Sequence, residues 1–287
     1  MSGLRPLDPR TAAWLLRRTL VAAFDDGCFS IAKGAAYSAL LSFFPVLTSA
    51  AAILFQTRAQ FVSTTIQSFL SEILPPGTED LVLRQFRVPG ARPAALLVVA
   101  GLISLWAASS VIKSLMEGFQ AAYRIPRNRG FFHRSGVAIA LVLLSIIPLL
   151  GASGLIVFGA DVERVVFDAV RRDPLNPPAW VWVWVSRGSR YVVAFGTMAL
   201  VTAILYYFGP YRRQHWRLVW PGAILATALW LAATSGFGWY VRHVGNYNVI
   251  YGSIGAGIAL LVWMYLLAAI ALIGCEFNAE FERSSVQ

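Results

Sequence analysis

Residues that build metal centres, disulfides and catalytic clusters are scarce in this sequence. It has two cysteines, Cys28 and Cys275, and three histidines, His133, His215 and His243, all far apart along the chain. No HExxH, CxxC, Walker A or GxSxG pattern occurs, and these patterns accompany zinc peptidases, dithiol redox proteins, ATP-driven pumps and serine hydrolases. The sequence therefore predicts no catalytic residue, no metal site and no cofactor, and we expect the protein not to be an enzyme.

Charge is also scarce, while hydrophobic residues are abundant. Charged residues make up 13% of the chain and hydrophobic residues 57%, with a mean hydropathy of +0.63. An α-helix needs about 20 mostly apolar residues to cross the hydrocarbon core of a bilayer. Stretches of that kind cover residues 35–55, 94–112, 137–160, 191–208, 218–237 and 249–273. These helices could not all be buried in a soluble protein of this size, so we predict an all-α, polytopic membrane protein with six transmembrane helices.

The basic residues orient this protein in the membrane. Lys and Arg are concentrated on the cytoplasmic side of membrane proteins, and the short loops 113–136 and 209–217 are rich in them. With both loops inside, the N-terminal segment 1–34 and the C-terminal tail 274–287 are cytoplasmic, and residues 35–273 form the six-helix transmembrane domain. Both cysteines then lie near the cytoplasmic face, where thiols stay reduced, so no disulfide is expected.

Amphipathic patterns flank the predicted spans. Apolar residues recur at helical spacing within 13–24, while Arg17 and Arg18 occupy other faces. This pattern predicts an N-terminal helix that lies on the inner membrane surface or packs against the cytoplasmic end of the bundle. Residues 60–73 and 162–169 of the outer loops have similar apolar stripes followed by prolines, and they predict extracytoplasmic helices.

The start of the fourth span is left open by three tryptophans. Trp180, Trp182 and Trp184 precede it, and aromatic residues of this kind commonly anchor a helix at the level of the lipid headgroups. The helix begins either at the apolar run from 191 or nearer Trp180. A ligand platform is the less favoured alternative for the three rings.

Small residues and prolines mark candidate packing and hinge positions. The small residues are Gly34, Ser38 and Ser42 in the first span and Gly252, Ser253 and Gly257 in the sixth. Ridges of this kind let helix backbones approach closely in lipid, so packing is the favoured interpretation and pore lining the alternative. Pro45 and Pro148 interrupt the first and third spans and free backbone carbonyls there, which makes them candidate hinges.

Ionisable residues avoid the middle of every span and gather at the inner ends of two of them. Lys113 and Glu117 are four residues apart near the end of the second span, a spacing that allows an ion pair. Glu276, Asn278 and Glu280 follow the sixth span. These five residues are candidates for a gate that handles a substrate or a coupling ion. The interpretation that we prefer is a structural salt-bridge layer completed by Arg124, Arg127 or Arg129.

Three segments carry a family pattern. They are KGAAYSALLSFFP at 33–45, WAASSVIKSLMEGFQAAYRIPRNRG at 106–130, and 251–280, which opens YGSIGAGIALLVWMYL and closes LIGCEFNAE. Together they resemble the YihY/virulence factor BrkB family, which implies a six-helix protein of the bacterial inner membrane. The family's recurrent positions map to Tyr37, Ser42, Pro45, Lys113, Tyr123, Tyr251, Gly252, Gly274, Glu276 and Asn278. The resemblance attaches no catalytic role to any of them.

The resemblance also implies a class of function. Members of the family have carried the label ribonuclease BN, but a metal-dependent nuclease needs clustered His and Asp ligands, which this sequence lacks. Suggestions for the family centre on export of envelope components, so we expect a transporter or exporter of an amphipathic or anionic envelope component such as a lipid. A non-transporting membrane scaffold is the alternative. Anionic membrane lipids are the expected partners, nucleic acid is not expected, and a homo-oligomer is an open alternative.

Overall fold

The computed structural model describes residues 9–56, 94–126, 130–148, 179–243 and 252–286. Its helices are α1 (Pro9–Asp25), α2 (Cys28–Gln56), α5 (Ala94–Ala122), α7 (Ala179–Phe208), α8 (Trp216–His243), α10 (Gly252–Val286) and a helix over Phe131–Pro148. No strand occurs in these residues, and the predicted all-α fold is confirmed. The predicted extracytoplasmic helices at 60–73 and 162–169 lie outside the described residues.

Six helical stretches are long and apolar enough to cross a membrane. They are Cys28–Leu47, Val98–Ala122, Phe131–Pro148, Tyr191–Phe208, Trp216–Tyr240 and Gly255–Ser284. Large apolar side chains on their outer faces remain uncovered, including Trp106, Ile147 and Val192. Such surfaces suit contact with lipid rather than with water, and the protein is a multi-pass membrane protein.

Several helices extend beyond the apolar stretches from which they were predicted. α7 begins at Ala179, so the helix itself starts before the tryptophans. α2 continues through Pro45 without ending there. α10 continues to Val286, so residues 274–286 of the predicted C-terminal tail are helical.

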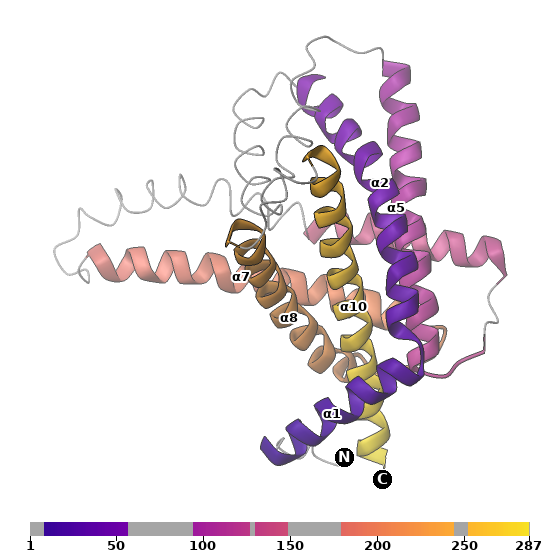
Figure 1. The fold of residues 1–287 in the computed structure, drawn as a ribbon, viewed down its shortest axis with the longest axis vertical. Coiled ribbons are helices and arrows are strands. Elements are labelled where there is room, and N and C mark those ends of the chain that lie inside the picture. Colours follow the sequence, from indigo (N-terminus) through magenta and orange to yellow (C-terminus); the bar gives the residue numbers. More distant parts are fainter. Residues whose placement is uncertain (1–8, 57–93, 127–129, 149–178, 244–251, 287) are drawn as a thin grey trace.

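The N-terminal helix α1 packs against the bundle along one face. Leu15, Thr19 and Ala23 are buried there, four residues apart, and α1 contacts α10 and α2. Leu16 and Leu20 lie on an exposed face of the same helix. Figure 1 shows α1 crossing the C-terminal part of α10 at the lower end of the molecule. One face of α1 therefore packs on protein, and the exposed leucines give it a second apolar surface that suits a membrane.

α10 is the centre of the bundle. It contacts α1, α2, α5 and α8, and Figure 1 shows it between the α2–α5 pair and α8, with α7 crossing behind. Half of the apolar stretch of α10 is buried, against 11% for the helix Phe131–Pro148. Side chains from neighbouring helices bond to its backbone: the Tyr206 hydroxyl donates to the Ala271 carbonyl at 2.6 Å, and the Trp230 indole to the Leu267 carbonyl at 2.8 Å.

α8 and α10 approach each other closely where they cross, at two glycines. A Cβ at Gly222 would lie 2.0 Å from the Gly274 carbonyl oxygen, and a Cβ at Gly274 would lie 2.5 Å from the Tyr206 hydroxyl. Only glycine fits at both positions. Two glycines of the predicted ridges do not make such a contact, because a Cβ at Gly34 or Gly257 would meet no described atom within 4 Å. The surroundings of Gly252 and Ser253 lie outside what the structure describes. A small-residue spacing permits close approach but does not say where the neighbouring helix lies.

We predict that Gly222→Ala destabilises the protein and that Gly236→Ala does not. The new methyl group at 222 would meet backbone atoms of α10, which cannot move aside, and overpacking of this kind costs about 1–3 kcal/mol. Gly236 lies on the same helix with open space around it, so alanine there should be neutral or slightly stabilising. Thermal unfolding of the two variants in lipid nanodiscs makes the comparison. Equal unfolding temperatures would contradict the close approach of α8 and α10 at Gly222.

Candidate functional site

The charged residues of the described chain gather at one end of the bundle. Every Asp, Glu, Lys and Arg whose side chain is described lies in one of three places: in α1, in the part of α2, α5, α8, α10 or the helix Phe131–Pro148 nearest this end, or in the segments that join these helices. We call this region the charged end. The middle of each described span has no ionisable charge, as predicted from the sequence, so the charged end is the part of the described chain where polar chemistry can occur.

Two tight turns bring an aspartate and an arginine together there. α1 and α2 are joined at Gly27, whose positive φ of 70° suits glycine. Arg124 lies in the turn that follows α5, with a φ of 54°. Its N–H donates to the Ala121 carbonyl and the Ile125 N–H donates to the Gln120 carbonyl, the hydrogen-bond pattern of a Schellman cap. These turns place Arg124 Nε 3.5 Å from Asp26 Oδ1. Arg124 was expected to pair with the acids of the last helix, and its partner is instead at the α1–α2 turn.

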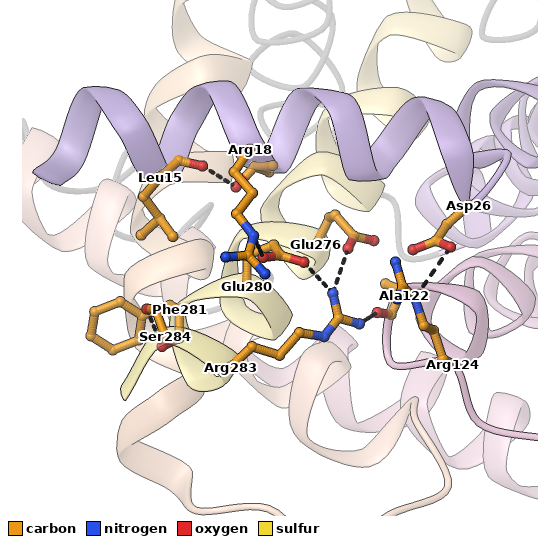
Figure 2. Close-up of polar contacts among 11 residues, drawn as sticks. Leu15, Arg18, Asp26, Ala122, Arg124, Glu276, Glu280, Phe281, Arg283 and Ser284 are labelled. Carbon is orange, nitrogen blue, oxygen red and sulfur yellow. Dashed lines mark hydrogen bonds and ion pairs between the residues drawn. The ribbon is translucent and has the colours of Figure 1, made fainter. Parts of the chain in front are cut away.

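Glu280 of α10 is held by arginines from two helices. Its Oε2 lies 2.5 Å from Arg18 Nε of α1, and its Oε1 accepts from Arg283 Nη1, three residues along α10. Figure 2 shows Glu280 between these two arginines. Arg283 also donates from Nη2 to the Ala122 carbonyl at 2.6 Å, so it caps the C-terminal end of α5, where the helix dipole favours a cation. Three helices are joined through this one carboxylate and its partners.

Glu276 lies one turn earlier on α10 and is bound much less well. Its side chain is 0% exposed, and its one ion pair within the described ranges is a 3.5 Å contact between Oε1 and Arg283 Nη1. Its other oxygen, Oε2, is buried and has no hydrogen-bond partner among the described residues. Asp26 Oδ2 is in the same condition, and Figure 2 shows Glu276 between Glu280 and Asp26. A buried carboxylate oxygen without a partner is costly. Glu280 Oε2 also makes no hydrogen bond to the described residues, but it has the 2.5 Å ion pair with Arg18, whereas Glu276 Oε2 has no such charged partner among them.

Asn278 serves the crossing of α8 and α10. Its Oδ1 accepts from the Gly222 N–H at 2.6 Å, and its Nδ2 donates to the Val219 carbonyl at 3.0 Å. Both bonds reach the backbone of α8 beside Pro221, a residue that has no N–H of its own. The fully buried amide therefore joins two helices, and this geometry favours a packing role over a gating role.

Lys113 and Glu117 meet through a third residue. Glu117 pairs with Arg134 from the helix Phe131–Pro148, and Arg134 Nη2 also donates to the Lys113 carbonyl at 2.7 Å. The partner of Glu117 is therefore Arg134 instead of Lys113. Arg127 and Arg129, the other expected partners, lie outside the described residues. The structure does not bring Lys113 into contact with Glu276, whose arginine is Arg283.

The loop between α7 and α8 is fastened to the same end. Arg212 pairs with Glu282 of α10, and its guanidinium lies 4.5 Å from the centre of the Tyr123 ring, a cation–π arrangement. Burial raises the pKa of the Tyr123 phenol well above its usual value, so the ring remains neutral beneath the cation.

Sequence reasoning identified the acids of the charged end and missed most of their partners. Arg283 was identifiable, because it lies three and seven residues after Glu280 and Glu276 on one helix face. Arg18, Asp26, Arg134 and Arg212 come from other segments, and no local spacing points to them. Among the described residues no group of three His, Cys, Asp or Glu side chains is placed to hold a metal ion. The arrangement can bind helices together, and at Glu276 it leaves polar atoms unsatisfied.

Comparisons with known proteins agree with the family resemblance. The chain belongs to the virulence factor BrkB family, whose model matches residues 20–287. The putative ribonuclease-like protein YfkH of Bacillus subtilis (strain 168) is 29% identical over 260 residues, which cover 85% of this chain and 86% of that protein. A UPF0761 membrane protein of Alkalilimnicola ehrlichii is 28% identical over 263 residues, which cover 91% of this chain and 56% of the relative. One from Paraburkholderia xenovorans is 28% identical over 253 residues, with 87% and 56% covered.

The chain thus spans most of the Bacillus protein and about half the length of these UPF0761 relatives. No solved structure matches it.

We predict that Glu280→Gln lowers the stability of the protein more than Asp25→Asn. The first change leaves Arg18 and Arg283 without their shared carboxylate. Breaking a buried pair costs about 3–5 kcal/mol, and because both arginines are partly exposed we expect about 1–3 kcal/mol. Asp25 is an exposed acid at the end of α1, and its neutralisation should change stability by less than about 0.5 kcal/mol. The test is the thermal unfolding temperature of both variants in nanodiscs. Equal losses of stability would mean that the ion pairs of Glu280 do not stabilise the fold.

Proposed function

We propose that this protein is a transporter or exporter of an amphipathic, anionic envelope component such as a lipid. In this proposal it lies in the bacterial inner membrane with both termini in the cytoplasm. The charged end then faces the cytoplasm, where the anionic headgroups of the inner leaflet lie beside it.

The observation that carries the proposal is a basic and aromatic surface at the charged end. We call it the basic–aromatic rim. Its members come from the start of the helix Phe131–Pro148, from the α7–α8 connection and from the first turn of α8. All of them are exposed: Phe131, Phe132, His133, Tyr211, Arg213, Trp216 and Arg217. The rings of His133 and Tyr211 are 6.2 Å apart, so the two segments meet.

The chemistry of the rim suits a phospholipid-like molecule. Arginine presents a planar fork of N–H donors that matches phosphate and carboxylate groups, and clusters of basic residues beside a membrane attract anionic lipids. Aromatic side chains are enriched at the headgroup level because one part of each ring is apolar and the rest tolerates water. A molecule with an anionic head and an apolar body could therefore contact the arginines and the uncovered apolar helix faces at once.

The spans themselves support an amphipathic cargo more than a small ion. The described middle parts of the helices lack ionisable residues, and intramembrane charges are what ion pathways commonly use. Pro45 lies inside α2 and Pro221 inside α8, and each removes one helical hydrogen bond. Helices weakened in this way can bend during transport.

A non-transporting scaffold is the second candidate. It is supported by the charged end itself, where ion pairs and backbone contacts fasten α1, α5, α10 and the α7–α8 loop together. A rigidly fastened bundle has no need to open. We propose no ribonuclease activity, although the name of the Bacillus relative contains the word, because arginines bind phosphate without cleaving it.

We predict that the purified protein moves a fluorescent anionic phospholipid between leaflets of reconstituted vesicles faster than empty vesicles do. The double variant Arg213→Gln, Arg217→Gln should slow this movement roughly tenfold or more, because each basic residue near an anionic surface contributes about 1 kcal/mol. Arg17→Gln is the matched control, since Arg17 is an exposed arginine of α1 outside the rim. Lipid movement no faster than in empty vesicles would refute transport of this lipid class and favour the scaffold.

A further inference from the structure

We propose that Glu276 is a proton-binding site: its carboxyl group holds a proton at neutral pH and donates it toward the carboxylate of Asp26. The site lies inside the charged end, at the junction of α10 with the α1–α2 turn. It goes beyond the proposed function, because a bound proton requires no lipid and no movement.

The distribution of arginines leads to this assignment. Three carboxylates and three arginines make up the cluster of Figure 2. Arg18 belongs to Glu280 and Arg124 to Asp26. Arg283 divides its donors among Glu280, the Ala122 carbonyl and, at 3.5 Å, Glu276. Glu276 is the most buried of the three acids and has the weakest ion pair.

Burial makes the ionised form of this residue unfavourable. An ion that leaves water needs close partners of opposite charge or several hydrogen bonds, and Glu276 has one long contact. Three buried carboxylate oxygens of the cluster make no hydrogen bond to the described residues, namely Glu276 Oε2, Asp26 Oδ2 and Glu280 Oε2. Glu280 Oε2 still has the 2.5 Å ion pair with Arg18, which leaves Glu276 Oε2 and Asp26 Oδ2. A proton on Glu276 removes the uncompensated charge. It also converts Oε2 into a donor, which can satisfy Asp26 Oδ2 directly or through a bridging water.

The remaining neighbours do not supply a better partner. The titratable groups that act on Glu276 come from the α1–α2 region, the end of α5 and α10 itself. They are Asp26, Cys28, Tyr123, Arg124, Cys275, Glu280 and Arg283. Both thiols and the phenol are buried or partly buried neutral groups. Arg124 is largely exposed to solvent, with 63% of its side chain accessible, and it is already paired. Each arginine of the cluster has a closer acceptor or is largely exposed, so a proton on Glu276 compensates the charge that the 3.5 Å contact with Arg283 leaves.

Infrared spectroscopy of the full chain in nanodiscs tests the site. The wild-type protein at neutral pH should show the C=O stretching band of a protonated carboxylic acid, and Glu276→Gln should abolish it. Asp26→Asn should shift the band, because the acceptor of the proton changes. Glu282→Gln, at an acid of the same helix that is paired with Arg212, should leave it unchanged.

A stability measurement separates a proton site from an ordinary ion pair. Glutamine has the shape of the protonated acid, so Glu276→Gln should unfold within about 2 °C of the wild type. A wild-type spectrum without the band, or a large loss of stability in Glu276→Gln, would show that Glu276 is ionised and would overturn the proposal.

Loss of the band on adding sodium would assign the site to a metal cation and would also overturn it. The lipid assay measures lipid movement between leaflets and the infrared band measures protonation of Glu276. The transport proposal and the proton-site proposal can therefore fail independently.

Discussion

The polar last turns of α10 hold the charged end of the molecule together. A helix that leaves the hydrocarbon core would ordinarily fray, because water competes for its backbone groups. Here Glu280 is bound by Arg18 of α1, and Arg283 caps the end of α5. Asn278 binds the backbone of α8 two residues before Glu280. Because these contacts come from separate elements, the position of each element at this end depends on α10 remaining helical through this segment.

This dependence bears on function. Glu280, which has close ion pairs with two arginines, suits a permanent joint. Glu276, one turn away, has a 3.5 Å ion pair with Arg283 and lies beside the α1–α2 turn. A gain or loss of charge at Glu276 would act on the elements that Glu280 fastens, since Arg283 touches both acids. The basic–aromatic rim lies at the same end and includes the loop that Arg212 ties to α10. Helix α10, which carries Glu276, Glu280 and Glu282, thus connects the junction to the surface that we propose for lipid.

The sequence predicted the membrane helices well because hydrophobic length is a local property that needs no knowledge of the neighbours. Helix ends were harder: α10 extends past its apolar run because Arg18 and Ala122, distant in sequence, stabilise its polar turns. The same limit explains the partner of Glu117, since the i, i+4 spacing suggested Lys113 while Arg134 arrives from another helix. Gly34 and Gly257 matched a packing pattern, yet the tight crossing uses Gly222 and Gly274. Spacing along one helix identified residue types, and only the fold identified contacts.

Amide hydrogen exchange of the lipid-embedded protein tests most directly whether α10 is the anchor of the charged end. Residues 275–283 are polar and lie beyond the apolar run, so an unsupported helix end would exchange them rapidly. If the interhelical contacts hold them, their amides should exchange about as slowly as those of the buried apolar stretch around Leu260 and Leu272. Rapid exchange of 275–283, with protection confined to the apolar stretch, would show that this segment is a loose tail and would contradict the account.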